Sequence, residues 1–393
     1  MTDIFRSELK AWLQANAPVT MCTPMPPSEV VWGGSKGTFP HPDSAVWLEA
    51  MSGRGYTAPR WPVDYGGAGL DDEQAAVLAE ELAAIGARAP LWSFGLWMLG
   101  PVLLEYGTEA QKRRFLPPIA RGEVRWCQGY SEPGAGSDLA SLRMRAEDRG
   151  DHWLINGQKV WTSYADEADW IFCLVRTEPE AGKHKGISFI LVDMASPGVS
   201  VRPIELISGS SPFCETFFDD VVVPKENLVG KRGEGWTIAK KLLEYERQNV
   251  SAIGFGGDGT VTLPSLAFRR GLCSDDGRIK DPVLRDKVTR LMMDEQAVAL
   301  LTQQAQAHAD AGVPGFGTSI VKYASARLNQ ARDDLAMDLL GMDGAGWSGE
   351  DFEPEVLSMS RAWLRSKGNS IEGGTSEIQL NVLAKHALNL PGN

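Results

Sequence analysis

Apolar side chains recur every three or four residues over most of the first 122 positions, which is the spacing of amphipathic helices. A proline- and glycine-rich stretch, Pro18 to Pro42, is expected to connect the first helix to the second, which Asp43 is expected to cap. Further on, Thr108-Glu109-Ala110-Gln111 has the form of a capping box, and its helix is predicted to stop at Pro117-Pro118. Residues 1–122 are therefore predicted to form a helical domain.

The pattern then changes to that of strands. From Leu142 to Glu147 apolar and charged residues alternate, as in a half-buried strand, and short apolar runs separated by turn residues follow. Asn156-Gly157 stands between Trp153-Leu154-Ile155 and Val160-Trp161, a pattern typical of a hairpin turn. We therefore predict a compact β barrel or sandwich over residues 123–230.

Long amphipathic segments return in the last third of the chain. Helices are predicted over 235–250, 282–311, 318–341, 352–367 and 376–389. Glycine-rich breaks between them fall at 254–257, 312–315 and 341–346. The chain is thus predicted to be an α+β protein, with a helical bundle at 231–393 as its third domain.

Charge and cysteine usage narrow the class of function. The formal net charge of -12 argues against nucleic-acid binding as the main role. The five cysteines include no Cys-x-x-Cys pair and the five histidines show no metal-ligand spacing, so we expect neither a disulfide framework nor a metal site. The N-terminus has no signal-peptide core, and no long apolar run predicts a membrane span. A cytoplasmic location without membrane partners is expected.

Candidate chemistry gathers between Trp126 and Ser163. The run Pro133-Gly134-Ala135-Gly136 leaves backbone N–H groups uncovered by side chains, so this loop can approach a phosphate or a polar ring edge closely. Trp161 offers a flat face for stacking. Composition alone fits a glycine-rich turn with a core tryptophan equally well, so both interpretations stay open at this point.

Six motifs, in this order, resemble those of the acyl-CoA dehydrogenase family, and the match spans nearly the whole chain. They read Trp61-Pro62-x-x-Tyr65-Gly66-Gly67, Ser131-Glu132-Pro133-Gly134-Ala135-Gly136-Ser137-Asp138, Asn156-Gly157-x-Lys159-x-Trp161-Thr162-Ser163, Phe217-Phe218-Asp219-Asp220-Val221-x-Val223-Pro224, Glu246-Arg247 and Gly374-Thr375-Ser376-Glu377-Ile378-Gln379. Any one of them could arise by chance, but six in family order at family-like spacing leave little room for that. The resemblance implies an N-terminal helical domain, a middle β-barrel domain and a C-terminal four-helix bundle.

The resemblance also implies bound FAD and an acyl-CoA thioester as substrate. In the family, a carboxylate removes the α-proton of the thioester while the β-hydride passes to flavin N5, which leaves a 2-enoyl-CoA. The flavin carries the redox chemistry, and the protein supplies the base, the alignment and the electrostatics. The electrons then usually pass to an electron-transfer flavoprotein.

Residue by residue, the resemblance implies cofactor contacts in several motifs. Ser131 matches the family's hydroxyl contact to the flavin ring, and Ser137 matches its polar contact near the flavin and CoA phosphates. Trp161 matches the tryptophan beside the isoalloxazine, and Ser163 stands where the family usually has a threonine that reaches N5. The cofactor residues implied are Gln128, Tyr130, Ser131, Gly136, Ser137, Trp161, Thr162, Ser163, Arg269, Thr375 and Glu377.

The catalytic base is where this chain departs from many family members. Gly373 occupies the position at which many members carry the catalytic glutamate, and Glu372 lies one residue too early. Other members carry the base in a Glu-Arg pair on a helix of the C-terminal domain, and Glu246-Arg247 matches that place. The resemblance therefore implies Glu246 as the base, with Arg247, Gly373 and Gly374 toward the substrate. An ordinary exposed helix glutamate is the other interpretation of Glu246, and Glu372 stays an alternative base.

Two more departures concern FAD contacts that family members take from a neighbouring subunit. The family often shows Arg-x-x-Phe-Gly, whereas this region reads Phe268-Arg269-Arg270-Gly271-Leu272-Cys273, in which either Arg269 or Arg270 could still reach the pyrophosphate. Asp338 occupies the place of a family glutamine and would not favour a pyrophosphate. This half of the cofactor site is therefore expected to be altered or unused.

The Gly-Gly-Thr ending together with the Glu-Arg pair also looks like bacterial dehydrogenases of steroid side chains or other cyclic acyl-CoAs, several of which are α2β2 assemblies. We therefore expect a branched, long or cyclic acyl-CoA, and either a homotetramer or an α2β2 heterotetramer. Two other possibilities remain. One is a partner subunit that completes a neighbour's flavin site, and the other is a flavin monooxygenase or oxidase on the same fold.

Overall fold

The structure, a computed structural model, describes residues 2–253, 262–311 and 316–391, without the side chains of 27, 246–253 and 309–310. The chain divides into two compact units, which are described separately. The first comprises Met1–Ile204 and Pro212–Tyr245, and the second comprises Glu205–Ser211 and Glu246–Asn393.

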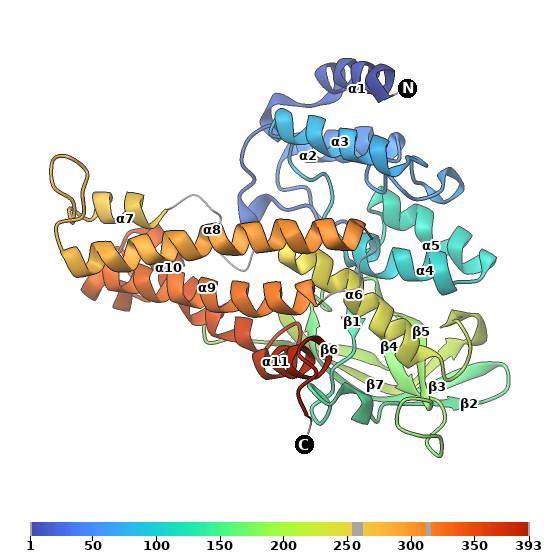
Figure 1. The fold of residues 1–393 in the computed structure, drawn as a ribbon. Helices are drawn as coiled ribbons and strands as arrows, with labels where there is room; N and C mark the ends of the chain where they lie inside the picture. The colour runs from blue at the N-terminus through green and yellow to red at the C-terminus, as the bar shows by residue number, and fades with distance from the viewer. Residues whose placement is uncertain (1, 254–261, 312–315, 392–393) are drawn as a thin grey trace. The chain divides into compact units, whose positions relative to one another are not determined.

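Helices form the N-terminal part of the first unit (Figure 1). Their bounds are α1 Thr2–Asn16, α2 Pro42–Gly53, α3 Asp72–Ala84, the π-helical segment Gly95–Leu99, α4 Gly100–Tyr106 and α5 Glu109–Arg121. α5 begins with the predicted capping box, in which Thr108 Oγ1 accepts from Gln111 N at 3.2 Å. α3 begins with a second capping box, in which Asp71 accepts from Gln74 N at 2.8 Å.

The predicted end of α5 is wrong. The helix does not stop at Pro117-Pro118 but continues to Arg121, where Gly122 ends it in the left-handed conformation with φ 71°. The two prolines remove backbone donors from the last turns, a local cost that normally ends a helix. Leu116 and Ile119 on the same turns are fully buried, so tertiary packing outweighs that cost.

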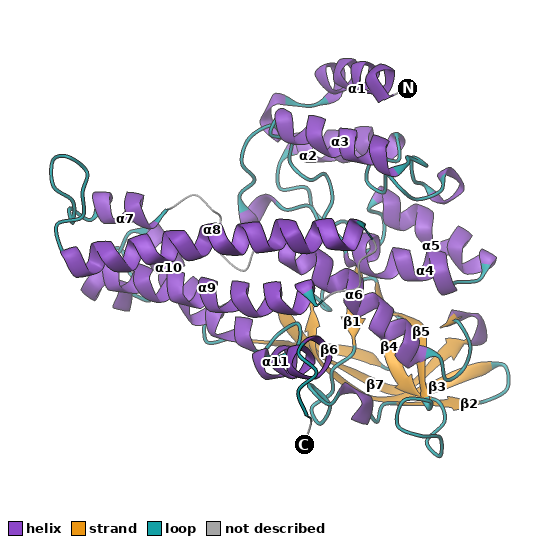
Figure 2. Ribbon diagram, viewed as in Figure 1, coloured by secondary structure: helices purple, strands orange, loops and turns teal. Residues whose placement is uncertain are grey.

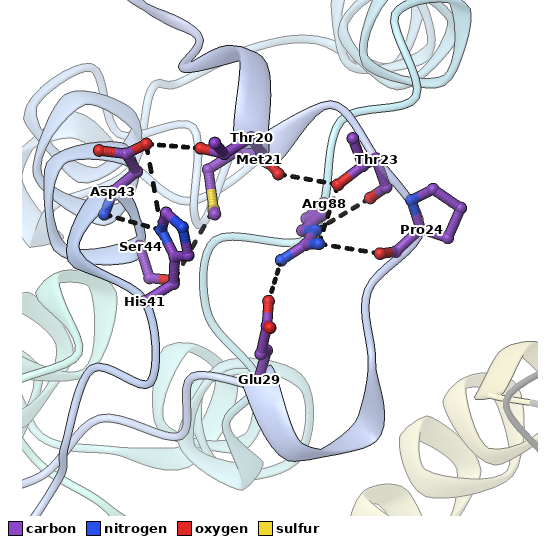
Figure 3. Close-up of polar contacts among 9 residues, drawn as sticks. All are labelled: Thr20, Met21, Thr23, Pro24, Glu29, His41, Asp43, Ser44 and Arg88. Atoms are coloured by element: carbon purple, nitrogen blue, oxygen red, sulfur yellow. Dashed lines mark hydrogen bonds and ion pairs between the residues drawn. The ribbon is translucent and has the colours of Figure 1, made fainter. Parts of the chain in front are cut away.

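The start of α2 also differs from the prediction. Its cap is His41, whose Nδ1 accepts a hydrogen bond from Asp43 N at 3.1 Å. Asp43 lies in the first turn instead, and its carboxylate accepts from Thr20 Oγ1 at 2.5 Å (Figure 3). A carboxylate there is favourable because the N-terminus of a helix carries partial positive charge.

Arg88 fastens the proline-rich connection from its other side (Figure 3). The guanidinium pairs with the Glu29 carboxylate at 2.5 Å and donates to the backbone oxygens of Thr23 and Pro24, each at 2.9 Å. Only 9% of the Arg88 side chain is exposed. An irregular segment thus follows a fixed path because one buried cation satisfies its backbone oxygens.

Strands β1 to β8 form one mixed sheet in the first unit (Figure 2). Their bounds are β1 Trp126–Gly129, β2 Arg145–Asp148, β3 His152–Ser163, β4 Trp170–Arg176, β5 Ile187–Asp193, β6 Val199–Ile204, β7 Phe213–Pro224 and β8 Leu228–Val229. The order across the sheet is β6-β7-β3-β2-β4-β5-β8, with β1 beside β4. One face of β4 and β5 packs against the helices through Phe172 and Phe189, and the other carries Cys173 and Ile190. Burial on both faces explains why these two strands are unbroken apolar runs.

Asn156-Gly157 does not form the predicted hairpin turn. β3 continues through it and pairs with β2 on one side and β7 on the other. The register with β7 shifts between Ile155 and Gly157, because β7 carries an extra residue where Asp220 has φ 49°. Asn156 Nδ2 bonds the Asp220 carboxylate at 2.9 Å. The Asn-Gly signal therefore marks a bulge, since pairing on both sides keeps the strand continuous.

Helices make up most of the second unit. α6 Gly235–Ile253 is divided between the two units, and the others are α7 Leu263–Arg269, α8 Pro282–Asp310, α9 Gly317–Leu340, α10 Pro354–Ser366 and α11 Ser376–Val382, the last followed by a π-helical segment Leu383–Ala387. α9 contacts α8, α10 and α11 (Figure 1). The predicted C-terminal helical bundle and the α+β class are thus confirmed, whereas α7 was not predicted. The predicted breaks at 254–257 and 312–315 lie outside the described residues. No helix in the described part is long and apolar enough to cross a membrane.

Candidate functional site

The loop of residues 131–138 follows β1 directly. Gln128, half-buried in β1, and the buried Tyr130 lead into it, and the Tyr130 ring meets two phenylalanine rings edge-on at 6.1 and 6.5 Å between centroids. The loop then turns on itself, because Glu132 and Ala135 exchange backbone hydrogen bonds of 3.0 and 2.9 Å. Its start is thereby fixed to the sheet core.

The part of this loop that carries Gly134 and Gly136, called the glycine rim below, is open to solvent. Ser137 is exposed and Ser131 is half-buried. A Cβ added at Gly134 or Gly136 would meet no described atom within 4 Å, and neither glycine has a left-handed φ. Bare backbone facing open space suits the close approach of a phosphate or a planar ring.

Trp161 projects from a bulge in β3. The register between β3 and β7 shifts between Lys159 and Thr162, which places one extra residue in β3. Trp161 has φ 60°, a strained value for a residue with a side chain, and 54% of it is exposed. Its ring touches that of Phe213 edge-on, with centroids 6.1 Å apart. Bulges that aim an aromatic ring outward and strained backbone occur together at binding sites.

The two residues after Trp161 face differently. Thr162 is fully buried, and its Oγ1 has no partner among the described residues. Ser163 is half-buried beside Phe213 of β7. A contact from Thr162 to a cofactor would therefore have to come from its backbone, whereas Ser163 keeps part of its side chain accessible.

Two contacts join the loop to this bulge. Val160 N donates to Ser131 O at 2.9 Å, and Lys159 Nζ lies 2.8 Å from a carboxylate oxygen of Glu132. Burial lowers the pKa of Lys159, while the Glu132 carboxylate acts in the opposite direction. Sequence reasoning missed this ion pair. The signal available was a lysine at an inward position of a strand.

The second unit holds the other predicted segment. Gly373 and Gly374 are exposed, with φ 62° and 86°. Gln379 Nε2 donates to Gly373 O at 3.2 Å. Thr375 caps α11 by accepting from Ile378 N at 3.2 Å. A tight left-handed turn thus precedes a short capped helix, on which Glu377 is exposed.

The Glu372 carboxylate makes hydrogen bonds to two side chains of the same unit. Its carboxylate accepts from Arg365 Nη2 at 2.6 Å and from Asn369 Nδ2 at 2.7 Å. Lys322 Nζ in turn donates to Asn369 O at 3.0 Å. The pattern did not reveal Arg365 and Asn369 in advance, and they make Glu372 an anchor for the turn.

The other predicted residues lie on helices α6 and α7 or just after α7. The side chains of Glu246 and Arg247 lie outside the described residues, although their backbone belongs to α6. Arg269 forms a two-pronged pair with Glu355 at 2.7 and 2.9 Å. Arg270 pairs with an aspartate of its own chain as well. The structure therefore groups 128–137 with 161–163 in one unit and 373–377 in the other.

Models of three domains match the chain: the acyl-CoA dehydrogenase N-terminal domain over residues 21–123, the middle domain over 127–221 and the C-terminal domain over 233–388. The chain is 35% identical over 396 residues to acyl-CoA dehydrogenase IpdE1 of Mycobacterium tuberculosis, with 100% of this chain and 99% of the relative covered. It is 31% identical to glutaryl-CoA dehydrogenase of Desulfococcus multivorans, with 78% and 80% covered.

Solved structures are similar over the full length. The Tcur3481-Tcur3483 steroid ACAD matches with a TM-score of 0.76 and 27% identity, covering 100% of this chain and 98% of that one. The ChsE4-ChsE5 complex from Mycobacterium tuberculosis matches with a TM-score of 0.70 and 26% identity, again with 100% and 98% covered.

Proposed function

The chain belongs to the acyl-CoA dehydrogenase family, and from that membership we propose that it is an FAD-dependent enzyme that converts a branched, long or cyclic acyl-CoA to the 2-enoyl-CoA. Members of the family are oxidoreductases that act on CH–CH bonds, and this chain is an acyl-CoA dehydrogenase in that general sense. The particular substrate, the cofactor contacts and the base are the parts that we propose.

The observation that carries the cofactor proposal is the exposed, left-handed Trp161 fastened to an open glycine rim. FAD bound there would accept the β-hydride of the substrate. The residues of the chain would hold and orient it: Trp161 offers a ring face, Ser131 and Ser163 offer hydroxyls, and Gly136 leaves its backbone bare. The other proposed cofactor contacts come from Gln128, Tyr130, Ser137, Thr162, Thr375, Glu377 and Arg269.

Arg269 would need to exchange a partner to fill its proposed role. Its pair with Glu355 is exposed on both sides, 46% and 36%, so the pair is worth little and can be given up. A diphosphate offers the same two-pronged geometry as a carboxylate. Arg269 therefore stays the proposed contact to the FAD pyrophosphate of a neighbouring subunit.

We assign the base to Glu246 and the substrate contacts to Ser137, Arg247, Gly373 and Gly374. Support comes from the other candidate base, Glu372, because its carboxylate oxygens already accept hydrogen bonds from Arg365 and Asn369. Removing an α-proton with Glu372 would cost that ion pair. Gly373 N–H would then donate to the thioester carbonyl as negative charge develops on it.

Three glutamine variants test this assignment. Glu246→Gln should slow anaerobic reduction of the bound flavin by about 10²–10⁴-fold, the usual contribution of a general base. Glu372→Gln should change that rate less than about tenfold and lower the melting temperature, because it weakens the anchor of the turn. Glu244→Gln, an exposed glutamate of the same helix, is the matched control. Reduction of the Glu246→Gln flavin at the wild-type rate would remove Glu246 from the mechanism.

The acyl group and the assembly are proposed by similarity. One similar structure is a steroid ACAD named for two proteins, and another is the ChsE4-ChsE5 complex. Within the branched, long or cyclic acyl-CoAs proposed above, these two structures favour a cyclic one. We propose an electron-transfer flavoprotein as acceptor and either a homotetramer or an α2β2 heterotetramer as the assembly. The number of moles of bound flavin per chain, measured on the protein purified alone, distinguishes between these two assemblies. A value near one supports the homomer, and a value near zero that added FAD does not rescue supports a partner subunit. Rapid reaction of the reduced flavin with air would favour an oxidase instead.

We also propose domain boundaries at 122/123 and 230/231 and a cytoplasmic location. The matched domain models end and begin near both boundaries. The described cysteines are all free, which suits a reducing compartment. Limited proteolysis, with cleavage sites read by mass spectrometry, would locate the boundaries.

A further inference from the structure

A buried ion pair lies under the proposed flavin surface. Lys159 is fully buried in β3, and Glu132, at the start of the 131–138 loop, is 9% exposed. Their nearest nitrogen and oxygen atoms are 2.8 Å apart. Lys159 points to the enclosed face of the sheet, where Thr216 is its cross-strand neighbour. The proposed chemistry uses neither charge.

The Glu132 carboxylate also holds the segment that leads from the loop to β2. One oxygen accepts from Lys159 Nζ and from Met144 N at 2.9 Å, and the other accepts from Arg143 N at 2.7 Å. Lys159 Nζ donates in addition to Tyr130 O at 3.2 Å. The pair thus fixes the backbone at Tyr130, before the loop, and at Arg143 and Met144, beyond its end.

The same lysine ties the loop to the tryptophan. Lys159 lies two residues before Trp161, and the next residue, Val160, donates its N–H to Ser131 O at 2.9 Å. The bulge that turns Trp161 outward begins at Lys159. One ion pair therefore sets the position of both segments relative to each other.

Stability alone does not account for such a pair. Moving two charges out of water is costly, and apolar residues of the same volume often serve a protein core equally well or better. What apolar residues cannot supply is a set of directed bonds to three backbone N–H and C=O groups. The contribution of the ion pair is therefore to hold these three backbone groups in fixed positions.

We propose that Lys159 and Glu132 are positioning residues that preform the flavin-binding surface by locking the glycine rim against the Trp161 bulge. This proposal rests on the FAD-binding role proposed above. Neither side chain needs to touch the cofactor, and each acts through Tyr130, Ser131 and Trp161.

The test is the double variant Lys159→Met/Glu132→Leu, which leaves no buried charge unpaired. The matched control is Lys225→Met/Asp148→Leu, because Asp148 of β2 and Lys225, which directly follows β7, form a lysine–carboxylate pair with 43% and 27% exposure. The measurements are the thermal melting of the apoprotein, the Kd for FAD from flavin fluorescence, and the visible spectrum of the bound flavin.

We expect the double variant to fold but to melt several degrees below wild type, because Arg143 N, Met144 N and Tyr130 O lose their partners. We also expect it to bind FAD about 10- to 100-fold more weakly and to shift the flavin absorption bands. The control should leave Kd and spectrum unchanged. Wild-type Kd and spectrum in the double variant would overturn the positioning role. If the double variant does not fold, Glu132→Gln and Lys159→Met take its place, each of which breaks the ion pair, and unchanged FAD binding in both would overturn the positioning role equally. Absence of FAD binding in the wild-type protein, alone or with a partner chain, would instead remove the proposed function.

Discussion

Gly136 offers a clean separation between folding and cofactor binding. Its φ is not left-handed, and an added Cβ would meet no described atom within 4 Å. Gly136→Ala should therefore leave the apoprotein as stable as wild type or raise its unfolding free energy by about 0.4–1 kcal/mol, because alanine narrows the unfolded ensemble.

Binding should change in the opposite direction. If a ligand lies on this backbone at van der Waals distance, about 3.5–4.0 Å, a new methyl group has to displace it. Inserting methylene-sized groups into a packed contact costs about 1–3 kcal/mol, which corresponds to roughly 5- to 150-fold in Kd. Gly136→Val should cost more than Gly136→Ala, since its two methyl groups reach further.

The assay combines apoprotein melting with titration of FAD by its fluorescence. Gly53→Ala is the matched control, because Gly53, the last residue of α2, likewise has no left-handed φ and no described atom near its Cβ position. The expected signature is a stable apoprotein with weakened FAD binding for Gly136 variants only. Wild-type affinity in Gly136→Val would show that the rim does not face the cofactor.

Three more results are expected, from the strained backbone of Trp161, the hydrogen bonds of Arg88 and the burial of three cysteines. Trp161→Gly should leave apoprotein stability within about 1 kcal/mol of wild type, because relief of the left-handed backbone offsets the extra freedom of glycine in the unfolded chain. It should nevertheless weaken FAD binding at least tenfold, and unchanged affinity in the same titration would contradict it. Arg88→Met should lower the unfolding free energy in urea by about 2–4 kcal/mol, since Glu29 and two backbone oxygens lose a buried partner, whereas a change below about 0.5 kcal/mol would count against that fastening. Burial raises the pKa of Cys173 to about 12 and also raises the pKa of Cys127 and Cys214. Iodoacetamide at about pH 8 should therefore modify only Cys22 and Cys273 in the folded protein, and mass spectrometry would identify the modified residues. The free energy of unfolding should also fall as the pH rises from about 9 toward 12, because the thiols ionise at a lower pH in the unfolded chain than in the folded protein.

Local patterns predicted the helices well, because the signals that form a helix lie within a few residues of one another. The capping box at Thr108 and the periodicity of α9 are of this kind. The errors arose where distant contacts decide. Pro117-Pro118 remains helical because Leu116 and Ile119 are buried. Asn156-Gly157 remains in a strand because β2 and β7 pair with it from both sides.

The same distinction applies to the candidate site. Trp161 and the glycine rim stood out because their residue types carry binding chemistry by themselves. The partner of Lys159 lies 27 residues away, and no local pattern joins the two. The position of Glu372 in the sequence argues against it as the base, and that stays a prediction, whereas its contacts with Arg365 and Asn369 form only when the end of α10 folds back on the turn.

The glycine turn explains why the base would lie on another element. Gly373 and Gly374 both have left-handed φ values, and residues with side chains are strained there by about 1–2 kcal/mol. A Cβ at Gly374 would also meet Gln379 Nε2 at 2.6 Å, the group that holds the turn through Gly373 O. A glutamate at position 373 would carry that backbone strain, whereas a side chain at position 374 would displace the bond that holds the turn. With the turn in place, the neighbouring carboxylate of Glu372 becomes an anchor, and a dehydrogenase built this way would need its base from a separate helix, which is the role that we propose for Glu246 of α6.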